Sequence, residues 1–337
     1  MSSASLPPTY AAARDGAAVL PRPRGRIVVS GKDRATYLQG LLTNDVVALG
    51  AGQGCYSAYL TPQGRMMADL WVYELGDVIL LSMSPAVKDT VLAKLDQFIF
   101  SEDVQLGDVS DTFGAVAIVG PRSAQAAATA LGIDASVLAG LPEHGNVRVT
   151  HDGEPAIALR ITDAGEPGYE LLVPRERSAL LDASVRAAGA AALDEATADV
   201  LRIEGGVPLF GRDMDEDTIP LEAGIESRAI SFTKGCYVGQ EVIIRVLHRG
   251  HGRVARKLVG LTFDGGVAEP GTALQIDGKD IGTITSSAMS PALGRGIALG
   301  YVKRDFAAPG TRITSAQGLQ AEVVALPFVQ RGETPTR

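Results

Sequence analysis

Apolar residues recur along the first two thirds of the chain with the periods of strands and helices. A short apolar run at Arg26–Val29 predicts a strand, and the apolar positions that follow Asp33 fall on one face of a helix. The segments Cys55–Leu60 and Arg65–Tyr73 flank a turn at 61–64 whose proline and glycine suit a β-hairpin. These elements predict a unit of mixed α+β structure.

A second strand–glycine–helix pattern, at Ala115–Leu131, repeats the first one. Val119-Gly120-Pro121 stands between strand and helix as Val29-Ser30-Gly31 does in the earlier pattern. The repeat predicts two related α+β units that divide near residue 112. Further elements are predicted from period and capping residues, with strands at Val78–Ser82, Ala156–Ile161 and Tyr169–Val173, and helices after Ser84, at Arg177–Ala188 and after Asp194.

The pattern changes beyond Arg253, where short apolar strands alternate with Gly, Pro and Asp and no helical period survives. This pattern of short strands and turn residues is typical of a small β-barrel or sandwich. At the other end, Met1–Arg24 is rich in Ala, Ser and Pro, which predicts a loose N-terminal arm. The sequence therefore predicts an arm at 1–24, an α+β region at 25–253 and a C-terminal β-barrel at 254–330.

Composition narrows the class of protein. With 337 residues, 46% hydrophobic and 21% charged, the chain suits two or three packed globular units. Its net charge of −8 argues against a general nucleic-acid coat, which needs a broad basic surface. Only two cysteines are present and no apolar run is long enough to cross a membrane, so we expect a cytoplasmic protein without a disulfide framework.

The most informative motif is the octet Lys234-Gly235-Cys236-Tyr237-Val238-Gly239-Gln240-Glu241. A thiol reacts as the thiolate, and a neighbouring cation or a ring of backbone N–H groups favours that form. Lys234 would supply the cation, and Gly235 and Gly239 would permit turns that aim N–H groups at the Cys236 sulfur. The alternative is a cysteine that packs as a small apolar residue in a tight turn.

This octet resembles the signature of the YgfZ-type folate-binding proteins, which are relatives of the glycine-cleavage aminomethyltransferase (the T-protein, GcvT). The resemblance extends from about Gly25 to about Val324. Members of the group are associated with tetrahydrofolate, with maturation or repair of iron–sulfur enzymes and, through those enzymes, with tRNA thiolation. The resemblance implies two α+β units that enclose a central channel holding tetrahydrofolate, with Cys236 on a loop that faces it.

The same resemblance implies a set of folate contacts. In the family, the glutamate of a Gly-Tyr-Glu triplet holds the pterin edge, which places Glu170 and its neighbour Tyr169 in the folate site. Arg202 and Asp213 match a helix and a downstream loop beside the folate cavity, and Asn44 matches another cavity position. From the residues alone, an ion pair explains Arg202 and an ordinary helix end explains Asn44.

One stretch departs from the aminomethyltransferases. Their hairpin carries paired aspartates, one of them central to catalysis, whereas the matching residues here are Met66-Met67-Ala68-Asp69-Leu70. Asp69 is the candidate acid or base for transfer of a one-carbon unit. Because Met67, Asp69 and Trp71 alternate, the carboxylate is also explained as a mark of one strand face.

The segment 245–257 after the octet is basic, which predicts contact with an anionic partner: the glutamate tail of folate, an RNA phosphate or an acidic client protein. A solvated hairpin explains the basic segment equally well.

The residue types at 250–255 match a dinucleotide-binding fingerprint, but strand-like residues follow them where that motif needs a helix. Cys236, His248 and His251 lack the spacing of a zinc site, so no metal is predicted.

Two functions follow from these observations. The first is a tetrahydrofolate-binding accessory protein that supports assembly or repair of iron–sulfur clusters in client enzymes, including tRNA-modifying ones, with Cys236 and Lys234 in the chemistry. The second is a folate-dependent aminomethyl- or methyltransferase whose activity depends on Asp69. The sequence leaves the oligomeric state and the client enzymes open.

Overall fold

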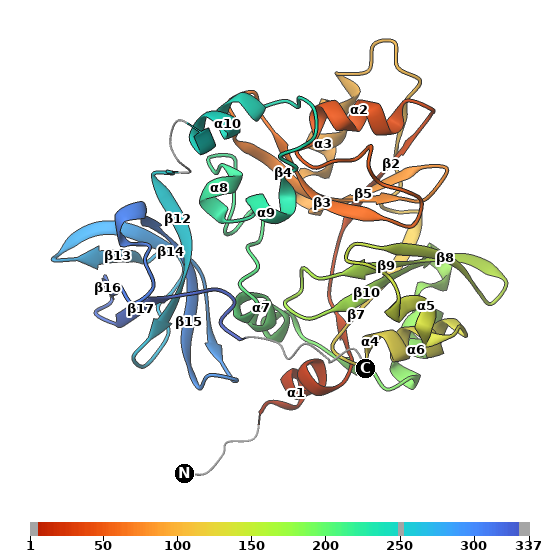
Figure 1. Ribbon diagram of the computed structural model, residues 1–337. Coiled ribbons are helices and arrows are strands. Elements are labelled where there is room, and N and C mark those ends of the chain that lie inside the picture. The colour runs from red at the N-terminus through yellow and green to blue at the C-terminus, as the bar shows by residue number, and fades with distance from the viewer. Residues whose placement is uncertain (1–5, 249–252, 330–337) are drawn as a thin grey trace.

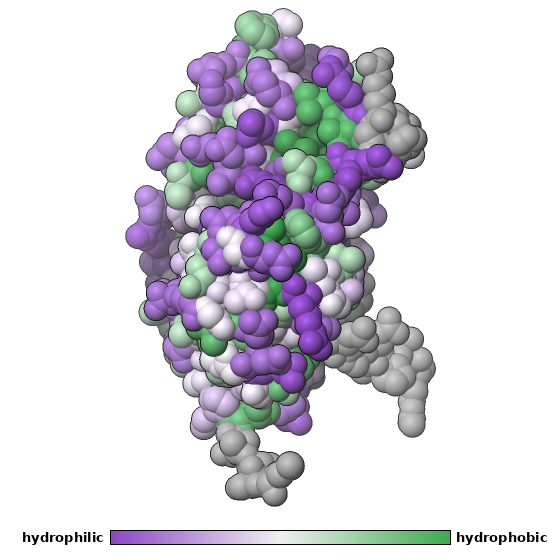
Figure 2. Space-filling view, turned by 90° about the vertical axis from the view of Figure 1, so that its left-hand side faces the viewer, coloured by the Kyte–Doolittle hydropathy of each residue, from purple (hydrophilic) through white to green (hydrophobic). Residues whose placement is uncertain are grey.

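The computed structural model describes residues 6–248 and 253–329 of the chain. Figure 1 shows two α+β units, one above the other, with a β-barrel beside them. This arrangement confirms the predicted fold class. Seen from the barrel side, the surface is largely hydrophilic, with its most extended apolar area in the upper part (Figure 2). None of the described helices is long and apolar enough to cross a membrane.

The first unit is an antiparallel sheet of order β3-β4-β5-β2-β6, packed with two helices. Gly64 has a φ of 75° in the hairpin turn, and the Ser84 side chain accepts the Ala86 N–H at the start of α3, as local sequence predicts. The strands and helices are β2 (Gly25–Ser30), α2 (Arg34–Leu41), β3 (Gly54–Leu60), β4 (Met66–Glu74), β5 (Ile79–Met83), α3 (Pro85–Asp96) and β6 (Gln105–Asp108).

The second unit is a sheet of order β11-β1-β7-β10-β9-β8. Its neighbouring strands run antiparallel except β1 and β11, which are parallel. The Asp194 side chain accepts the Thr197 N–H and so caps α7. The elements are β1 (Ala18–Leu20), β7 (Phe113–Val119), α4 (Ser123–Leu131), α5 (Ala135–Ala139), β8 (Asn146–His151), β9 (Glu154–Ile161), β10 (Gly168–Pro174), the 3₁₀ turn η1 (Arg175–Arg177), α6 (Ser178–Ala187), β11 (Ala191–Ala192) and α7 (Glu195–Glu204).

The N-terminal segment folds into α1 (Pro8–Asp15) and β1, so the prediction of a loose arm at 1–24 is wrong for these two elements, while residues 1–5 lie outside the described structure. Tyr10 is buried, and its hydroxyl donates to the buried Glu204 at 2.7 Å. Arg14 forms an ion pair with the same carboxylate. Glu204 lies 194 and 190 positions further along the chain, and local composition does not reveal partners at that distance.

A closed barrel of order β12-β15-β14-β13-β16-β17 forms the C-terminal body, as predicted. Helix α7 packs against β14 and β15, where Ile203, Ile297 and Leu299 form a small apolar cluster. The barrel elements are β12 (Arg256–Phe263), β13 (Ala273–Ile276), β14 (Lys279–Ser290), β15 (Arg295–Lys303), the 3₁₀ turn η2 (Arg304–Phe306), β16 (Arg312–Ser315) and β17 (Gln320–Val324).

Three short helices, α8 (Pro220–Ala223), α9 (Glu226–Ala229) and α10 (Gln240–His248), lie between the first unit and the barrel (Figure 1). The expectation of a hairpin directly after the octet is wrong, because residues 240–248 are helical. The β-branched residues there favour a strand locally, but Val242 packs against the hairpin turn at Gly64 and tertiary contact decides the outcome.

Candidate functional site

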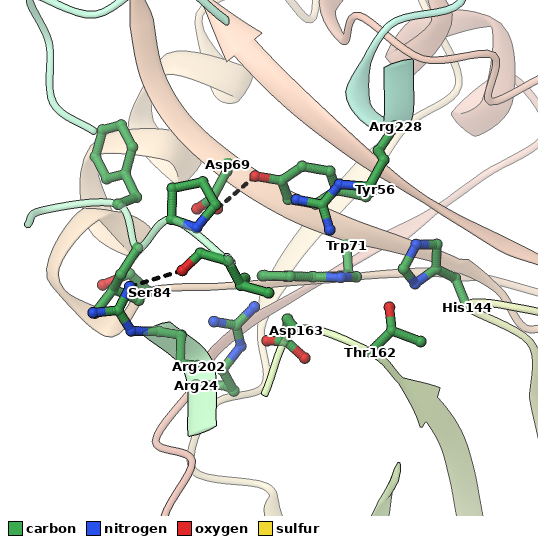
Figure 3. A pocket seen from close by; sticks show the side chains of 14 residues that line it. Arg24, Tyr56, Asp69, Trp71, Ser84, His144, Thr162, Asp163, Arg202 and Arg228 are labelled. Atoms are coloured by element: carbon green, nitrogen blue, oxygen red, sulfur yellow. Dashed lines mark hydrogen bonds between the residues drawn. The ribbon is translucent and has the colours of Figure 1, made fainter. Parts of the chain in front are cut away.

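A cavity opens where the two α+β units meet the segment that follows α7. Its inner chamber has a volume of about 40 Å³ (Figure 3). A larger outer cleft of about 410 Å³ adjoins the chamber and shares Arg24, Asp163, Arg202 and Phe210 with it. Further side chains that border the inner chamber are Tyr56, Asp69, Trp71, Ser84, His144, Thr162 and Arg228.

Asp69 is the buried acid of the inner chamber. It lies on β4 two residues before Trp71, so both side chains leave the same face of the strand. Its Oδ2 accepts the Tyr56 hydroxyl at 2.8 Å, and the Tyr56 and Trp71 rings lie 5.0 Å apart. Burial raises the pKa of Asp69, although Arg24 and the Tyr56 hydrogen bond oppose the rise. The chamber therefore holds a carboxylate that takes up a proton more readily than an exposed aspartate does.

Arg24 stands at the junction of the inner chamber and the outer cleft. Its guanidinium carbon lies 4.1 Å from the centre of the Trp71 ring, in cation–π contact. It donates to Ser82 through Nε to Oγ at 3.2 Å and through Nη2 to the carbonyl at 3.4 Å. Burial and the nearby Arg22 guanidinium lower the pKa of Arg24 to about 10, so it stays cationic at neutral pH.

A buried ion network lies behind this junction. Glu170 on β10 is fully buried and binds Arg22 through one carboxylate oxygen and Arg26 through the other, each at 2.7 Å. Arg22 also donates to the two Asp163 oxygens at 3.1 and 2.9 Å. Burial opposes ionisation of Asp163, but Arg22 and Arg24 hold its pKa below the ordinary value. The network fixes charged groups beside the cavity.

Comparison with known proteins identifies the family to which this architecture belongs. The chain matches the family profile described as GCVT N-terminal domain over residues 12–234, and the profile described as Glycine cleavage T-protein C-terminal barrel domain over residues 256–330. The chain belongs to the glycine-cleavage T-protein family. The α+β region and the barrel together are the two parts of the T-protein family architecture.

Curated relatives in the T-protein family align with most of the chain. Aminomethyltransferases of Rubrobacter xylanophilus and Streptomyces coelicolor are each 33% identical, over 91% of this chain and 81% and 84% of the relative. A putative chloroplastic transferase of Arabidopsis thaliana is 29% identical over 93% of this chain and 71% of the relative. The crystal structure of the glycine cleavage system aminomethyltransferase T from Bartonella henselae shares the fold, with a TM-score of 0.86 and 23% identity over 95% of this chain and 88% of that one.

In this T-protein family member, the residues of the predicted pterin triplet face opposite sides of β10. Glu170 lies behind Arg22, which itself borders the outer cleft. Tyr169 is buried in the apolar core of the second unit, where its hydroxyl donates to the Leu138 carbonyl at 2.9 Å. A pterin edge at Glu170 would have to compete with Arg22 and Arg26 for the carboxylate oxygens. The Tyr169 side chain lies on the opposite side of the strand from this carboxylate.

Arg202 borders both the inner chamber and the outer cleft, and its guanidinium is bound on all sides. It donates to Asp199, the Val207 carbonyl, Asp213 and Ser286 at 2.9, 2.7, 2.7 and 2.9 Å. Asp213 also accepts the Ser286 hydroxyl at 2.7 Å. This pair joins α7 to the barrel strand β14, as the ion-pair explanation of Arg202 expects.

Asn44 ties the first unit to α9. Its side-chain amide donates to the carbonyls of Tyr56 and Arg228 at 2.8 and 2.9 Å, and its Oδ1 accepts the Asp45 N–H at 2.9 Å. Because Tyr56 and Arg228 both border the inner chamber, Asn44 supports the chamber wall from behind.

The Lys234 ammonium is committed to the end of α2. It donates to the carbonyls of Gln39, Leu42 and Asn44 at 2.6, 2.6 and 2.9 Å, which engages all three of its hydrogens. A cation in this place stabilises a helix C-terminus. Burial lowers the pKa of Lys234 to about 8. The structure thus gives Lys234 a role different from the predicted activation of Cys236.

The rest of the octet packs closely against the first unit. The Val238 N–H donates to the Gly40 carbonyl at 3.1 Å. Gly239 has a φ of 85°, and a Cβ there would lie 2.6 Å from the Thr61 carbonyl of the hairpin turn, so the position requires glycine. Cys236 is exposed and carries a free thiol, so the alternative of a cysteine packed as a small apolar residue is wrong.

Most residues that border the chamber were not among the predicted site residues, Arg24, Trp71 and His144 among them. Arg24 belongs to the segment predicted as a loose arm. Trp71 is the single tryptophan and shares a strand face with Asp69, which is the one signal that the sequence offers. His144 has a left-handed φ of 57° and an Nδ1 that, within the described structure, is buried without a hydrogen-bond partner. Burial lowers its pKa.

The basic segment 245–257 divides between α10 and β12, and part of it lies outside the described residues. Arg245 pairs with Glu241 at 2.6 Å, and Arg256 pairs with Glu222 at 3.1 Å. Part of the charge on which the prediction of an anionic partner depends is therefore neutralised within the chain. In the part of the chain that the structure describes, no group of three or more His, Cys, Asp or Glu is placed to hold a metal ion.

Proposed function

We propose that this chain is a tetrahydrofolate-dependent aminomethyl- or methyltransferase. The observation that carries the proposal is Asp69, a buried carboxylate on the wall of the inner chamber that is oriented by Tyr56 and lies near Arg24. Curated relatives that align with most of the chain are named aminomethyltransferases, which favours this activity over a YgfZ-type accessory role.

The outer cleft suits a ligand of the size of folate. Its volume of about 410 Å³ lies within the range of about 300–1,000 Å³ that is usual for small-molecule sites. Leu209 and Phe210 give it apolar surface for a pterin ring, and Arg22 and Arg212 place guanidiniums on its wall, each of them also paired with an aspartate. In our proposal, the carboxylates of the glutamate tail face these guanidiniums and the pterin end points inward to Asp69.

Asp69 would carry the proton that the transfer displaces. A bond between the donor carbon and a folate nitrogen forms with loss of a proton from that nitrogen, and the leaving atom of the donor gains one. Asp69 would accept the first proton and return it, because burial has raised the pKa of its carboxyl and an acid–base group works best near the operating pH. The Tyr56 hydroxyl fixes Oδ2, which leaves Oδ1 as the transferring oxygen.

A calorimetric titration with tetrahydrofolate, followed by a transfer assay, tests the proposal. We expect saturable binding at one site and conversion of tetrahydrofolate to a one-carbon derivative when an aminomethyl or methylamine donor is added. Mass spectrometry of the folate pool detects the product. Binding without conversion would refute the enzyme and leave a folate-binding protein, whereas the lack of any binding would refute folate dependence altogether.

A second candidate, a folate-binding accessory protein for iron–sulfur enzymes, is favoured by one observation. Cys236 is exposed on a loop that the Lys234 and Val238 hydrogen bonds hold in place. For this role, Cys236→Ala should keep tetrahydrofolate binding and abolish support of iron–sulfur client enzymes, tRNA-modifying ones included, in cells that depend on this chain. Cys55→Ala is the matched control, because burial raises the pKa of that thiol to about 12. Full support by the Cys236 variant would exclude the role.

A further inference from the structure

The inner chamber contains two opposite charges that have no ion-pair partner within 4.0 Å in the described structure: the Arg24 guanidinium and the Asp69 carboxylate. Arg22 and Arg202 are paired directly, with Asp163 at 2.9 Å and with Asp213 at 2.7 Å, whereas Arg228 on the chamber rim is exposed and lies over the Tyr56 ring at 5.4 Å. Among the described residues, Arg24 donates hydrogen bonds only to the neutral Ser82, and the Asp69 carboxylate accepts a hydrogen bond from the neutral Tyr56 hydroxyl. Enclosed charges without partners are costly, so a site of this kind suits a ligand that supplies both.

The two groups are held near each other by the aromatic wall of the chamber. Arg24 lies over the Trp71 ring at 4.1 Å, and Asp69 is on the same strand face as Trp71. In Figure 3, Asp69 and Arg24 lie toward one end of the Trp71 ring, while His144 lies beyond the other end. A cation and an anion therefore face the same small volume beside an apolar surface.

This arrangement is complementary to a small zwitterion. A guanidinium binds a carboxylate through two parallel N–H groups, and a carboxylate binds an ammonium. The chamber of about 40 Å³ has room for about three water molecules, which fits a compact ligand of a few atoms better than a pterin. The Tyr56 and Trp71 rings, 5.0 Å apart, give the chamber an aromatic wall.

We propose that the inner chamber binds a small amino acid whose amine carries the one-carbon unit, with its carboxylate on Arg24 and its ammonium on Asp69. This inference rests on the proposed function and names the class of its donor. It makes Arg24 the residue that selects donors with a carboxylate, and the outer cleft remains for the folate.

Calorimetric titrations of the full chain with N-methylglycine, methylamine and propionate test the inference. We expect N-methylglycine to bind at least tenfold more tightly than either probe with a single charge. Arg24→Gln should weaken N-methylglycine binding at least tenfold without weakening methylamine binding, and Arg24→Lys should keep part of the preference. Arg186→Gln, on the exposed face of α6, is the matched control and should bind as the unchanged chain does. Thermal unfolding of each variant verifies that it is folded.

Equal affinities for N-methylglycine and methylamine, or an Arg24→Gln variant that keeps the preference, would overturn the inference. A parallel titration with tetrahydrofolate separates this failure from failure of the proposed function. Folate binding and transfer from another donor, without zwitterion preference, would remove only the inference. Zwitterion binding without any folate binding would refute the proposed function and leave the chamber as a binding site for a small amino acid.

Discussion

Replacement of Asp69 by asparagine should lower the rate of one-carbon transfer by at least about 100-fold, the usual contribution of a positioned acid or base. The amide has the shape of the carboxylate and can still accept the Tyr56 hydroxyl, but it cannot take up a proton at neutral pH. Folate binding should persist in a calorimetric titration, so the loss should appear in kcat. Asp111→Asn, at an exposed side chain, is the matched control and should retain full activity.

The pH profile gives the same prediction a second readout. Burial raises the pKa of Asp69, so the active carboxylate is lost as the pH falls through a value above that of an ordinary aspartate. The rate should therefore decline on the acid side earlier than for an exposed carboxylate. Arg24 opposes the rise, so Arg24→Gln should move the acid limb to still higher pH. An acid limb that is identical in both proteins would exclude Asp69 as the titrating group.

Replacement of Glu170 by alanine should destabilise the protein by about 3–5 kcal/mol, the usual effect of removing one partner from a buried ion pair. The variant would leave the guanidiniums of Arg22 and Arg26 without the carboxylate that binds both of them inside the protein. Urea unfolding followed by circular dichroism measures the loss as a lower midpoint. Glu176→Ala, at an exposed position, should unfold like the unchanged chain.

The Glu170 variant also distinguishes two roles for this carboxylate. If Glu170 holds the pterin directly, as the family resemblance implies, its removal should abolish folate binding while the urea midpoint hardly moves. If Glu170 holds the arginines, stability falls first and ligand affinity falls only through the displaced Arg22 side chain. An unchanged midpoint together with lost binding would therefore contradict the ion-network role.

Local signals predict much of the fold. The Ser84 cap and the turn at 61–64 depend on neighbouring residues, and both appear where the sequence places them, while the region after Arg253 forms the predicted barrel. The helix α10 and the ordered N-terminal segment were missed because distant contacts decide them. Val242 meets Gly64 across the fold, and the partner of Tyr10 lies 194 residues away.

The candidate site was predicted only in part for the same reason. Asp69 borders the chamber because strand alternation, which is visible in the sequence, points it there. The ion pairs of Glu170 with Arg22 and Arg26 cannot be predicted from the local sequence, because these arginines are 148 and 144 positions away. Lys234 likewise finds its carbonyl acceptors nearly 200 positions earlier, so nearness in sequence to Cys236 was a poor guide to what it binds.

Strand β1 belongs to the second sheet and β2 to the first, so the residues between them, Pro21–Arg24, cross from one unit to the other. Two arginines of the cavity wall, Arg22 and Arg24, lie on this crossover. A rotation of one unit against the other would therefore change the direction of the Arg22 and Arg24 guanidiniums. A bound anion would in turn favour one orientation of the units. Such a rotation and ligand affinity would therefore be coupled in one thermodynamic cycle.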